Sequence, residues 1–417
     1  MNKKTKDSLI IGFALFSMFF GAGNLIFPGF LGLQVGDQYL PAILGFTVAG
    51  IGLPILAILA CAKGDGTYQT LASYVGKKFA IISTIVLFLA IGPMLAIPRT
   101  AATTYEVFLS HIIPNIPQVI LMAVYFILNL VFVLKRSSII DALGKYLTPA
   151  LITILVLIIS KGILFPIGDI VSTDATSVFS SSLIEGYQTM DAIAGLLFAT
   201  LITSSLISKG YEKKDMLPMV LKSSMVVIVG LTFVYGGLTF IGAQTVNIAP
   251  EGINNTSQLL FIAHSILGTL GTTLIGLAMA LACLTTSIGL ISTGAEFFEN
   301  ISNGKLNYKL NSIVISVVSF GVACLGVDKI ITISGPVLNI LYPVTITLII
   351  MGLTKDKLNS PLSFKCAVYT SLVLGLLLEL APSKLAFLPF SNIGFGWILP
   401  TIIIFIISYI IETRKTN

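Results

Sequence analysis

Long apolar runs alternate with short polar connections along the whole chain, and this pattern predicts a membrane protein built of helices. A helix needs about 20 predominantly apolar residues to cross a bilayer. Runs near that length cover residues 8–33, 39–62, 79–110, 117–134, 144–165, 188–208, 217–243, 266–298, 310–326, 334–353, 363–382 and 393–411. We therefore expect an all-α integral membrane protein with about 12 transmembrane helices.

The composition supports this interpretation. Because 55% of the 417 residues are hydrophobic and only 10% are charged, the chain has too little polar surface for a soluble globule. The net charge of +6 comes from basic residues spread over many short connections, so it does not indicate a nucleic-acid partner. The four cysteines lie far apart in or beside apolar segments, which favours neither a disulfide framework nor a metal site.

Basic residues concentrate in alternate connections, as expected when those connections face the cytoplasm. The basic start of the chain leads into an apolar run without a cleavage pattern, which predicts a retained first helix. The opposite side receives only Lys161, Lys329 and Lys384. The cytoplasmic set comprises Lys63, Lys77, Lys78, Lys135, Arg136, Lys145, Lys209, Lys213, Lys214, Lys222, Lys305, Lys309, Lys355, Lys357, Lys365, Arg414 and Lys415. This pattern predicts that both termini are cytoplasmic.

The first apolar run contains residues poorly suited to continuing a helix. Gly21 and Gly23 flank Ala22, Asn24 follows, and Pro28 comes one turn later. An unpaired backbone group in hydrocarbon costs several kcal/mol, so a helix break at this depth needs a protein partner, a cavity or a ligand. We predict a helix opened to hold a solute. Close packing of a Gly-x-Gly patch, with Asn24 bonded to a neighbour, explains the stretch equally well.

A similar interruption opens the sixth span, where residues 186–195 combine glycines with Asp191. It lies five helices after the first break, and an odd offset reverses the direction of crossing. Two interrupted helices in halves of opposite topology indicate an inverted-repeat transporter with its site near the midplane. The alternative is that Asp191 marks the start of the span at the outer surface. The long outer connections 166–187 and 244–265 are expected to form gates or lids.

A broken helix offers free N–H groups at one end and free C=O groups at the other. Ala22, Gly23 and Asn24 would present N–H groups, and residues 17–20 would present carbonyls, so a zwitterion fits between them. The eighth span carries three adjacent hydroxyls at Thr285, Thr286 and Ser287, which suit a weakly held monovalent cation such as Na⁺. Hydroxyls in membrane helices also commonly bond back to the preceding turn, which is the simpler explanation.

Several motifs together resemble a known family. These are Gly21-Ala22-Gly23-Asn24-Leu25-Ile26-Phe27-Pro28, Gly92-Pro93-Met94-Leu95-Ala96-Ile97-Pro98-Arg99-Thr100, the Gly186–Asp191 run, and Leu284-Thr285-Thr286-Ser287-Ile288 with Ala295-Glu296-Phe297-Phe298-Glu299. The chain resembles the bacterial branched-chain amino acid carriers, the leucine–isoleucine–valine cation symporters. That family is similar to the five-plus-five inverted-repeat fold of the bacterial leucine transporter in the amino acid–polyamine–organocation superfamily.

The resemblance implies Na⁺-coupled uptake of leucine, isoleucine and valine, with H⁺ coupling in some members. It implies a cation site made of the backbone oxygens of Ser17 and Phe20, the carbonyl of Ala282 and the hydroxyls of Thr285 and Thr286. The substrate-binding residues implied at the two breaks are Gly21, Ala22, Gly23, Asn24, Met190, Asp191 and Ala192. The substrate carboxylate would face the first break and its ammonium the second.

Arg99 and Glu106 are two turns apart in the third span, and both are expected to face a cavity or a partner. Arg99 could contact the substrate carboxylate, pair with Glu106 or Asp191 in an outer gate, or lie above the membrane core, and the last two are favoured. An apolar substrate pocket could be lined by Met94, Ile97, Met190 and Ile193, although ordinary packing explains each one alone.

The predicted organisation is a first repeat over residues 1–165, a second repeat over 166–353, and two further helices in 354–417. The only expected partners are the small-molecule substrate and the lipid bilayer of a bacterial cell membrane, and the oligomeric state is left open. An integral-membrane enzyme is disfavoured because the mid-membrane carboxylates are isolated and both histidines lie at outer boundaries. The alternative transporter is a proton-coupled or exchanging amino acid permease in which Asp191 or Glu106 carries the proton.

Overall fold

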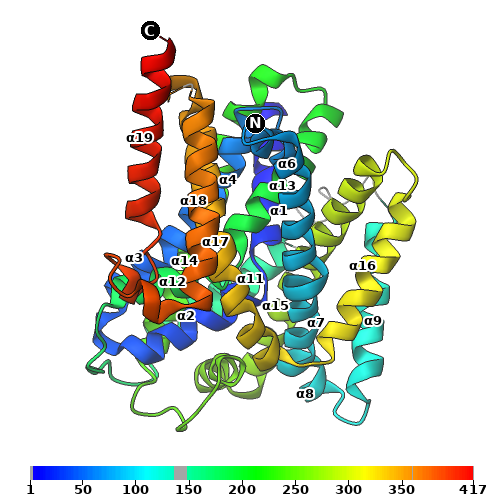
Figure 1. Cartoon of the computed structure of the whole chain (residues 1–417). Helices are drawn as coiled ribbons and strands as arrows, with labels where there is room; N and C mark the ends of the chain where they lie inside the picture. Colours follow the sequence, from blue (N-terminus) through cyan, green and yellow to red (C-terminus); the bar gives the residue numbers. More distant parts are fainter. Residues whose placement is uncertain (1–2, 136–147, 359, 417) are drawn as a thin grey trace.

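The computed structural model describes residues 3–135, 148–358 and 360–416 (Figure 1). This part of the chain is helical, with short 3₁₀ and π turns and no strand. Seven continuous helical stretches within it are long and apolar enough to cross a membrane, and three shorter apolar helices accompany them. The prediction of an all-α membrane protein is confirmed, and the number of crossings remains a prediction.

The helices follow one another in the order α1 (Lys3–Phe19), α2 (Ala22–Val35), η1 (Gly36–Gln38), α3 (Tyr39–Thr47), η2 (Val48–Gly52), α4 (Leu53–Ala62), α5 (Tyr68–Ser73), α6 (Lys77–Leu89), η3 (Ala90–Ala96), α7 (Ile97–Thr104), η4 (Tyr105–Leu109), α8 (Ser110–Ile112), α9 (Gln118–Val133), α11 (Thr148–Leu164), α12 (Val178–Tyr187), α13 (Asp191–Ser208), α14 (Lys213–Ala243), α15 (Asn255–Ile301), α16 (Tyr308–Ala323), α17 (Val327–Leu358), α18 (Pro361–Leu380), η7 (Pro382–Leu385), η8 (Ser391–Ile393) and α19 (Ile398–Thr416).

The first predicted break is present. Helix α1 ends at Phe19, and α2 begins at Ala22 after Gly21 adopts an extended conformation with φ −111° and ψ −163°. Pro28 lies inside α2, in its second turn, and the helix continues through it. The apolar run of residues 8–33 therefore folds as two helices joined by an unwound turn.

The second break is also present, but it lies between two helices and not at the start of a span. Helix α12 ends at Tyr187 and α13 begins at Asp191, with Met190 in the left-handed region at φ 66°. This conformation costs a non-glycine residue roughly 1–3 kcal/mol, so the surrounding structure must hold it. Gly186 and Gly195 lie within helices on either side of the break.

The predicted outer connection 166–187 contains a helix over 178–187, and its role as a gate or lid stays a prediction. The serines and the glutamate of this segment suggested a loop, yet α12 packs along α3. The approach is close, because a Cβ built on Gly186 would lie 3.1 Å from the Phe46 carbonyl oxygen of α3 and 2.7 Å from the Cβ of Ala49 in η2. Similarly, part of the predicted 244–265 connection is helical, since α15 begins at Asn255 and bends at Gly268, where φ is 60°.

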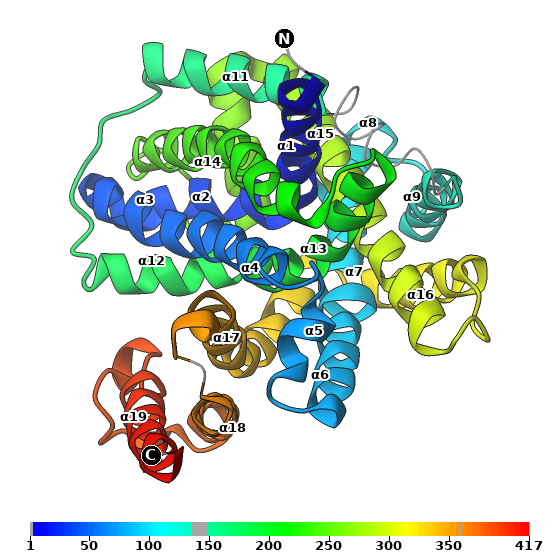
Figure 2. The same ribbon diagram turned by 90° about the horizontal axis from the view of Figure 1, so that it is seen from above.

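The helices form two groups that meet at the first break (Figure 2). In one group, α14 packs against α1, α2 and α3, while α12 packs against α3 and α13 against α4. In the other, α15 and α16 pack with α7 and α9. Helices α1 and α2 both contact α15, so the unwound turn between them lies at the boundary of the two groups.

Helices α18 and α19 stand to one side of both groups (Figures 1 and 2). Helix α18 packs against α17, and α19 packs against α18. The chain between α18 and α19 makes two short 3₁₀ turns, η7 and η8.

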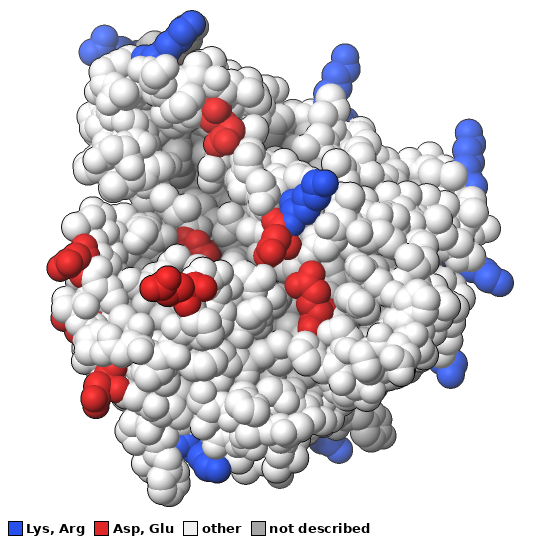
Figure 3. All heavy atoms as spheres, turned by 90° about the horizontal axis from the view of Figure 1, so that it is seen from below, with Lys and Arg blue, Asp and Glu red and all other residues white. Residues whose placement is uncertain are grey.

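The N- and C-termini lie at the same end of the molecule (Figure 1). On the opposite face, acidic side chains lie from the middle of the view to its left edge, whereas basic side chains stand mainly at the edge (Figure 3). Arg136 and Lys145, which belong to the predicted cytoplasmic set, lie outside the described residues.

Candidate functional site

The carbonyl end of α1 is held by hydroxyls from α15. The Thr285 hydroxyl donates to the Ser17 carbonyl and to the Ala282 carbonyl, both at 2.8 Å. The Thr286 hydroxyl donates to the Met18 carbonyl at 3.0 Å, and it lies 3.4 Å from the Ser17 carbonyl. Because α1 stops here, these carbonyls lack helical partners, and the two threonines take their place.

The amide end of α2 is the complementary half of the break. Asn24 accepts a hydrogen bond from the Gly21 N–H at 3.1 Å and so caps the new helix. Within the described residues, the buried N–H groups of Ala22 and Gly23 have no hydrogen-bond partner. They are unpaired donors at the positive end of a helix, which favours a negatively charged group.

Asn24 also connects the two breaks. Its amide nitrogen donates to the Asp191 carboxylate at 2.6 Å and to the Tyr235 hydroxyl on α14. The Tyr235 hydroxyl in turn lies 3.4 Å from the same carboxylate oxygen. Asp191 is only 3% exposed, so the alternative that places it at the outer surface is wrong. The two unwound turns thus lie side by side, as the sequence predicted.

Arg99 of α7 lies between the same two turns. Its guanidinium donates to the Gln188 carbonyl at 2.7 Å and to the Thr189 carbonyl at 3.4 Å. A Cβ built on Gly23 would lie 3.0 Å from the guanidinium, which also sits 5.6 Å from the centre of the Phe27 ring. Arg99 is 3% exposed, and its charge is therefore satisfied inside the protein.

Further contacts hold the second break in place. The Tyr187 carbonyl accepts from the Met190 N–H at 2.9 Å and from the Tyr342 hydroxyl at 3.0 Å. The Gln188 side chain accepts from Ser334 of α17 at 3.1 Å. Arg99 binds the Gln188 and Thr189 carbonyls, which would otherwise have no partner after the end of α12.

Some predicted contacts are absent. Within the described part of the chain, Arg99 forms no ion pair with Glu106 or Asp191 within 4.0 Å, so the predicted gate pair is wrong for this conformation. Glu106 instead accepts from the Val327 N–H at 3.0 Å and so caps α17. Met94 is 54% exposed and does not line a buried pocket, because the π turn η3 around Pro93 directs it outward.

The predicted cation ligands largely converge. Ser17, Ala282, Thr285 and Thr286 meet through the contacts described above, and a Cβ on Gly21 would lie 3.1 Å from the Thr286 hydroxyl. The Phe20 carbonyl precedes Gly21, but no hydrogen bond links it to this cluster. Neutral hydroxyl and carbonyl oxygens at a helix C-terminus suit Na⁺. The described residues contain no cluster of His, Cys, Asp or Glu that could hold a metal ion, which argues against a transition-metal site.

Four further residues of the site escaped the sequence analysis: Gln188, Thr189, Tyr235 and Tyr342. A lone tyrosine in an apolar span resembles ordinary packing. The only signal was the glycine pair after Tyr235, of which Gly237 allows close approach of a neighbouring helix, because a Cβ built there would lie 2.2 Å from the Ile159 side chain.

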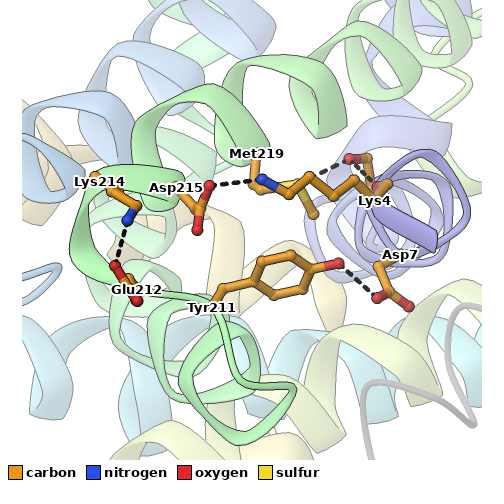
Figure 4. A network of polar contacts seen from close by, with 8 residues as sticks. Lys4, Asp7, Tyr211, Glu212, Lys214, Asp215 and Met219 are labelled. Carbon is orange, nitrogen blue, oxygen red and sulfur yellow. Dashed lines mark hydrogen bonds and ion pairs between the residues drawn. The ribbon is translucent and has the colours of Figure 1, made fainter. Parts of the chain in front are cut away.

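The end of α1 away from the site is tied to α14 (Figure 4). Lys4 forms an ion pair with Asp215 at 2.8 Å, and the Tyr211 hydroxyl donates to Asp7 at 2.7 Å. The Lys4 ammonium lowers the pKa of Asp215, whereas partial burial and the bond to Asp7 raise the pKa of Tyr211 to about 12. Helix α1 is therefore attached to α14 at this end as well as along its length.

Two broken helices whose amide and carbonyl ends meet are an arrangement that secondary transporters use. Solved transporters share this fold: MhsT bound to L-phenylalanine has a TM-score of 0.59 with 15% identity, covering 96% of this chain and 98% of that one. Mhp1, a nucleobase-cation-symport-1 family transporter, has a TM-score of 0.67 with 12% identity, covering 98% and 93%.

The sequence comparisons identify the family. The sequence model described as branched-chain amino acid transport protein matches residues 4–415. The branched-chain amino acid permease BraB of Bacillus subtilis is 35% identical over 97% of this chain and 95% of its own length. BrnQ of Corynebacterium glutamicum is 35% identical over 98% and 96%. The chain belongs to the branched-chain amino acid transport family. It is a multi-pass bacterial membrane transport protein and not an enzyme.

Proposed function

We propose that this protein carries leucine, isoleucine and valine into the cell together with Na⁺, by alternating access. The observation that supports this proposal best is the meeting of the two unwound turns through Asn24 and Asp191 at 2.6 Å. Unpaired amides lie on one side of the meeting point, and a carboxylate lies on the other. This is the complementarity that an amino acid zwitterion needs.

The first break would bind the substrate carboxylate. The free N–H groups of Ala22 and Gly23 point from a helix N-terminus, and the adjacent Arg99 adds a positive charge. Gly21 and Asn24 set the shape of this turn through their capping bond. Contact between Arg99 and the substrate carboxylate, disfavoured from the sequence, is favoured by this geometry.

The second break would bind the ammonium. Asp191 supplies the negative charge, and Met190 and Ala192 flank it in the unwound turn and the first turn of α13. Ile97 and Ile193 are buried, and each lies two residues from a polar residue of the site, Arg99 or Asp191. Their apolar side chains would suit the branched aliphatic side chain of the substrate. The proposal thus assigns the two ends of the substrate to named residues.

Ser17, Ala282, Thr285 and Thr286, with the Phe20 carbonyl, would hold Na⁺ where α1 and α15 meet. The bound ion would supply a positive charge that joins the two helices. The threonine hydroxyls, which now donate to the carbonyls, would turn their oxygens toward that point. Because α1 and α15 belong to different helix groups, occupancy of this site would favour one arrangement of the groups over another.

The movement we propose is rocking of the group containing α1, α2, α12, α13 and α14 against the group containing α7, α9, α15 and α16. In this proposal the two broken helices each open one half of a five-plus-five inverted repeat, over residues 1–165 and 166–353, and residues 354–417 complete 12 crossings. Both termini would be cytoplasmic, consistent with their common end (Figure 1).

One observation favours a second candidate, a proton-coupled or exchanging permease. Asp191 is buried and receives hydrogen bonds from Asn24 and Tyr235, without an ion pair within 4.0 Å in the described residues. An intramembrane carboxylate in this setting is suited to carrying a proton.

Competition in proteoliposomes tests the substrate class. The purified full chain should accumulate radiolabelled leucine, and an excess of unlabelled isoleucine or valine should suppress the signal, whereas lysine and glutamate should not. Leucine uptake that competes equally well with charged amino acids would contradict the proposed specificity.

A further inference from the structure

A cavity of about 480 Å³ lies away from the two helix breaks, between α12, α17, α18 and the connection that leads to α19. Its volume is within the range of roughly 300–1,000 Å³ that small-molecule sites occupy. The face opposite the termini is visibly hollowed next to the part of the molecule that carries α18 and α19 (Figure 3). The residues proposed for substrate and cation binding do not line this cavity.

The cavity has one charged side chain with an incomplete set of partners. The Glu379 carboxylate of α18 accepts a hydrogen bond from the Asn339 amide of α17 at 3.0 Å. Among the described residues, no lysine, arginine or histidine lies within 4.0 Å of it. The aromatic residues Tyr187 and Trp397 line the same space. A carboxylate beside aromatic rings is the environment that an ammonium group prefers.

An apolar groove adjoins this cavity. It has a volume of about 240 Å³ and is lined by α17, α18 and α19, with side chains such as Ile350, Phe364, Ile402 and Phe405. Trp397 lines both spaces, so they meet at its ring. The groove exists because α19 packs against α18, and α18 against α17, which leaves the side between α17 and α19 open.

The connection between α18 and α19 is exposed and apolar. Phe387 is 77% exposed and Phe390 is 54% exposed, and Leu380, the last residue of α18, is 75% exposed. Exposed aromatic residues that flank membrane helices are typical of the boundary between hydrocarbon and headgroups. This connection therefore places Glu379 at headgroup depth, with the apolar groove extending toward the membrane interior.

We propose that the cavity and the groove together bind one phospholipid whose headgroup carries an ammonium group. The ammonium would donate to Glu379, and an acyl chain would fill the groove between α17 and α19. A polar end next to an apolar channel matches the amphipathic form of a lipid better than that of a free amino acid, which has no chain to fill the groove.

This site would act on the transport machinery through α12. Ile184 and Tyr187 of α12 line the cavity, and the Tyr187 ring stacks on Tyr342 of α17 at 3.9 Å. Tyr187 directly precedes Gln188, whose carbonyl binds Arg99. A lipid in the cavity would brace the outer half of the broken helix against α17 and α18.

Native mass spectrometry of the purified full chain tests lipid binding without reference to substrate or coupling ion. Phosphatidylethanolamine and phosphatidylcholine with the same acyl chains are titrated separately, because the quaternary choline group has no N–H donor. We expect a preference for phosphatidylethanolamine of roughly two- to fivefold, as for one partly exposed hydrogen bond that the choline group cannot make. Glu379→Gln should abolish that preference, whereas Glu251→Gln, in the exposed connection between α14 and α15, should keep it.

Equal binding of the two lipids by the unmodified protein would overturn the proposal, even if Glu379→Gln failed to fold. Retention of the preference by Glu379→Gln would overturn it as well. Displacement of the lipid by millimolar leucine at this site would show that the cavity serves a water-soluble amine and would contradict a lipid site.

Discussion

The Arg99 guanidinium of α7 and the Gln188 carbonyl at the end of α12 are joined by a hydrogen bond of 2.7 Å. This contact places a fixed positive charge at the carbonyl end of a broken helix, next to the amide end of another. Arg99 thereby connects the helix group of α7 with the helix group of α12. In the function proposed above, a substrate entering between the two groups would meet this side chain.

Replacing Arg99 by lysine tests this role. Arg99→Lys keeps the charge but loses the planar fork that reaches both Gln188 and Thr189. Loss of a charge-assisted hydrogen bond in a buried site costs about 1.5–3 kcal/mol, so leucine uptake at low substrate concentration should fall about tenfold or more. Arg414→Lys, at an exposed position of α19, is the matched control and should transport normally. Normal uptake by Arg99→Lys would remove Arg99 from the site.

Asp191 can be tested by an isosteric change. Asp191→Asn preserves an oxygen for Asn24 and Tyr235 but removes the negative charge proposed to bind the ammonium. We expect leucine binding, measured by scintillation proximity on the purified protein, to weaken by about tenfold or more. Tyr235→Phe should weaken it less, because Asn24 still holds the carboxylate. If Asp191→Asn binds leucine normally but loses its response to a pH gradient, Asp191 carries a proton instead.

The contacts at the start of α1 predict a pH range in which their contribution to stability should not change. The lowered pKa of Asp215 keeps this carboxylate ionised, and the pair with Lys4 is lost only as the pH falls through that lowered value. The raised pKa of Tyr211, about 12, keeps its hydroxyl protonated until the pH rises through that value. Neither contact therefore changes between about pH 5 and pH 9.

Thermal unfolding of the full chain and of Lys4→Gln checks this expectation. Any difference in melting temperature between the two proteins should be constant over that pH range, and it should shrink only in stronger acid. A difference that varies between pH 5 and pH 9 would show that another titrating group governs this end of α1.

Close packing of α2 on α14 predicts a contrast between two glycines of the same helix. A Cβ built on Gly242 would lie 2.1 Å from the Gly29 carbonyl oxygen, whereas one on Gly236 would meet nothing within 4 Å. Overpacking costs about 1–3 kcal/mol, so Gly242→Ala should lower the melting temperature by several degrees. Gly236→Ala should leave it unchanged or slightly higher, since alanine is the better helix former. Equal effects of the two changes would contradict this packing.

The sequence allowed the first break to be predicted because its glycines and Asn24 interrupt an apolar run. The second break was predicted from Asp191, but α12 was mistaken for a loop. Its serines and Glu185 are polar enough to suggest solvent, and only packing against α3 makes the segment a helix. Tertiary burial of this kind leaves no local pattern in a single sequence.

The direction in which the Arg99 side chain points could not be predicted from the sequence either. Its place relative to Glu106 depends on the π turns η3 and η4, which insert extra residues and rotate α7 between them. Regular helical spacing would have put both side chains on similar faces, two turns apart. In the structure, Arg99 reaches the second break while Glu106 caps α17.

Radiolabelled leucine uptake into proteoliposomes under imposed ion gradients tests the central claim most directly. We predict that an inward Na⁺ gradient drives accumulation and that a pH gradient alone does not. Thr285→Ala with Thr286→Ala should weaken the dependence on Na⁺ before leucine binding is lost. Thr293→Ala should behave as the unmodified protein, because that hydroxyl bonds within its own helix to Gly289 at 2.8 Å. Uptake that ignores Na⁺ and follows the pH gradient would contradict a Na⁺ site between α1 and α15.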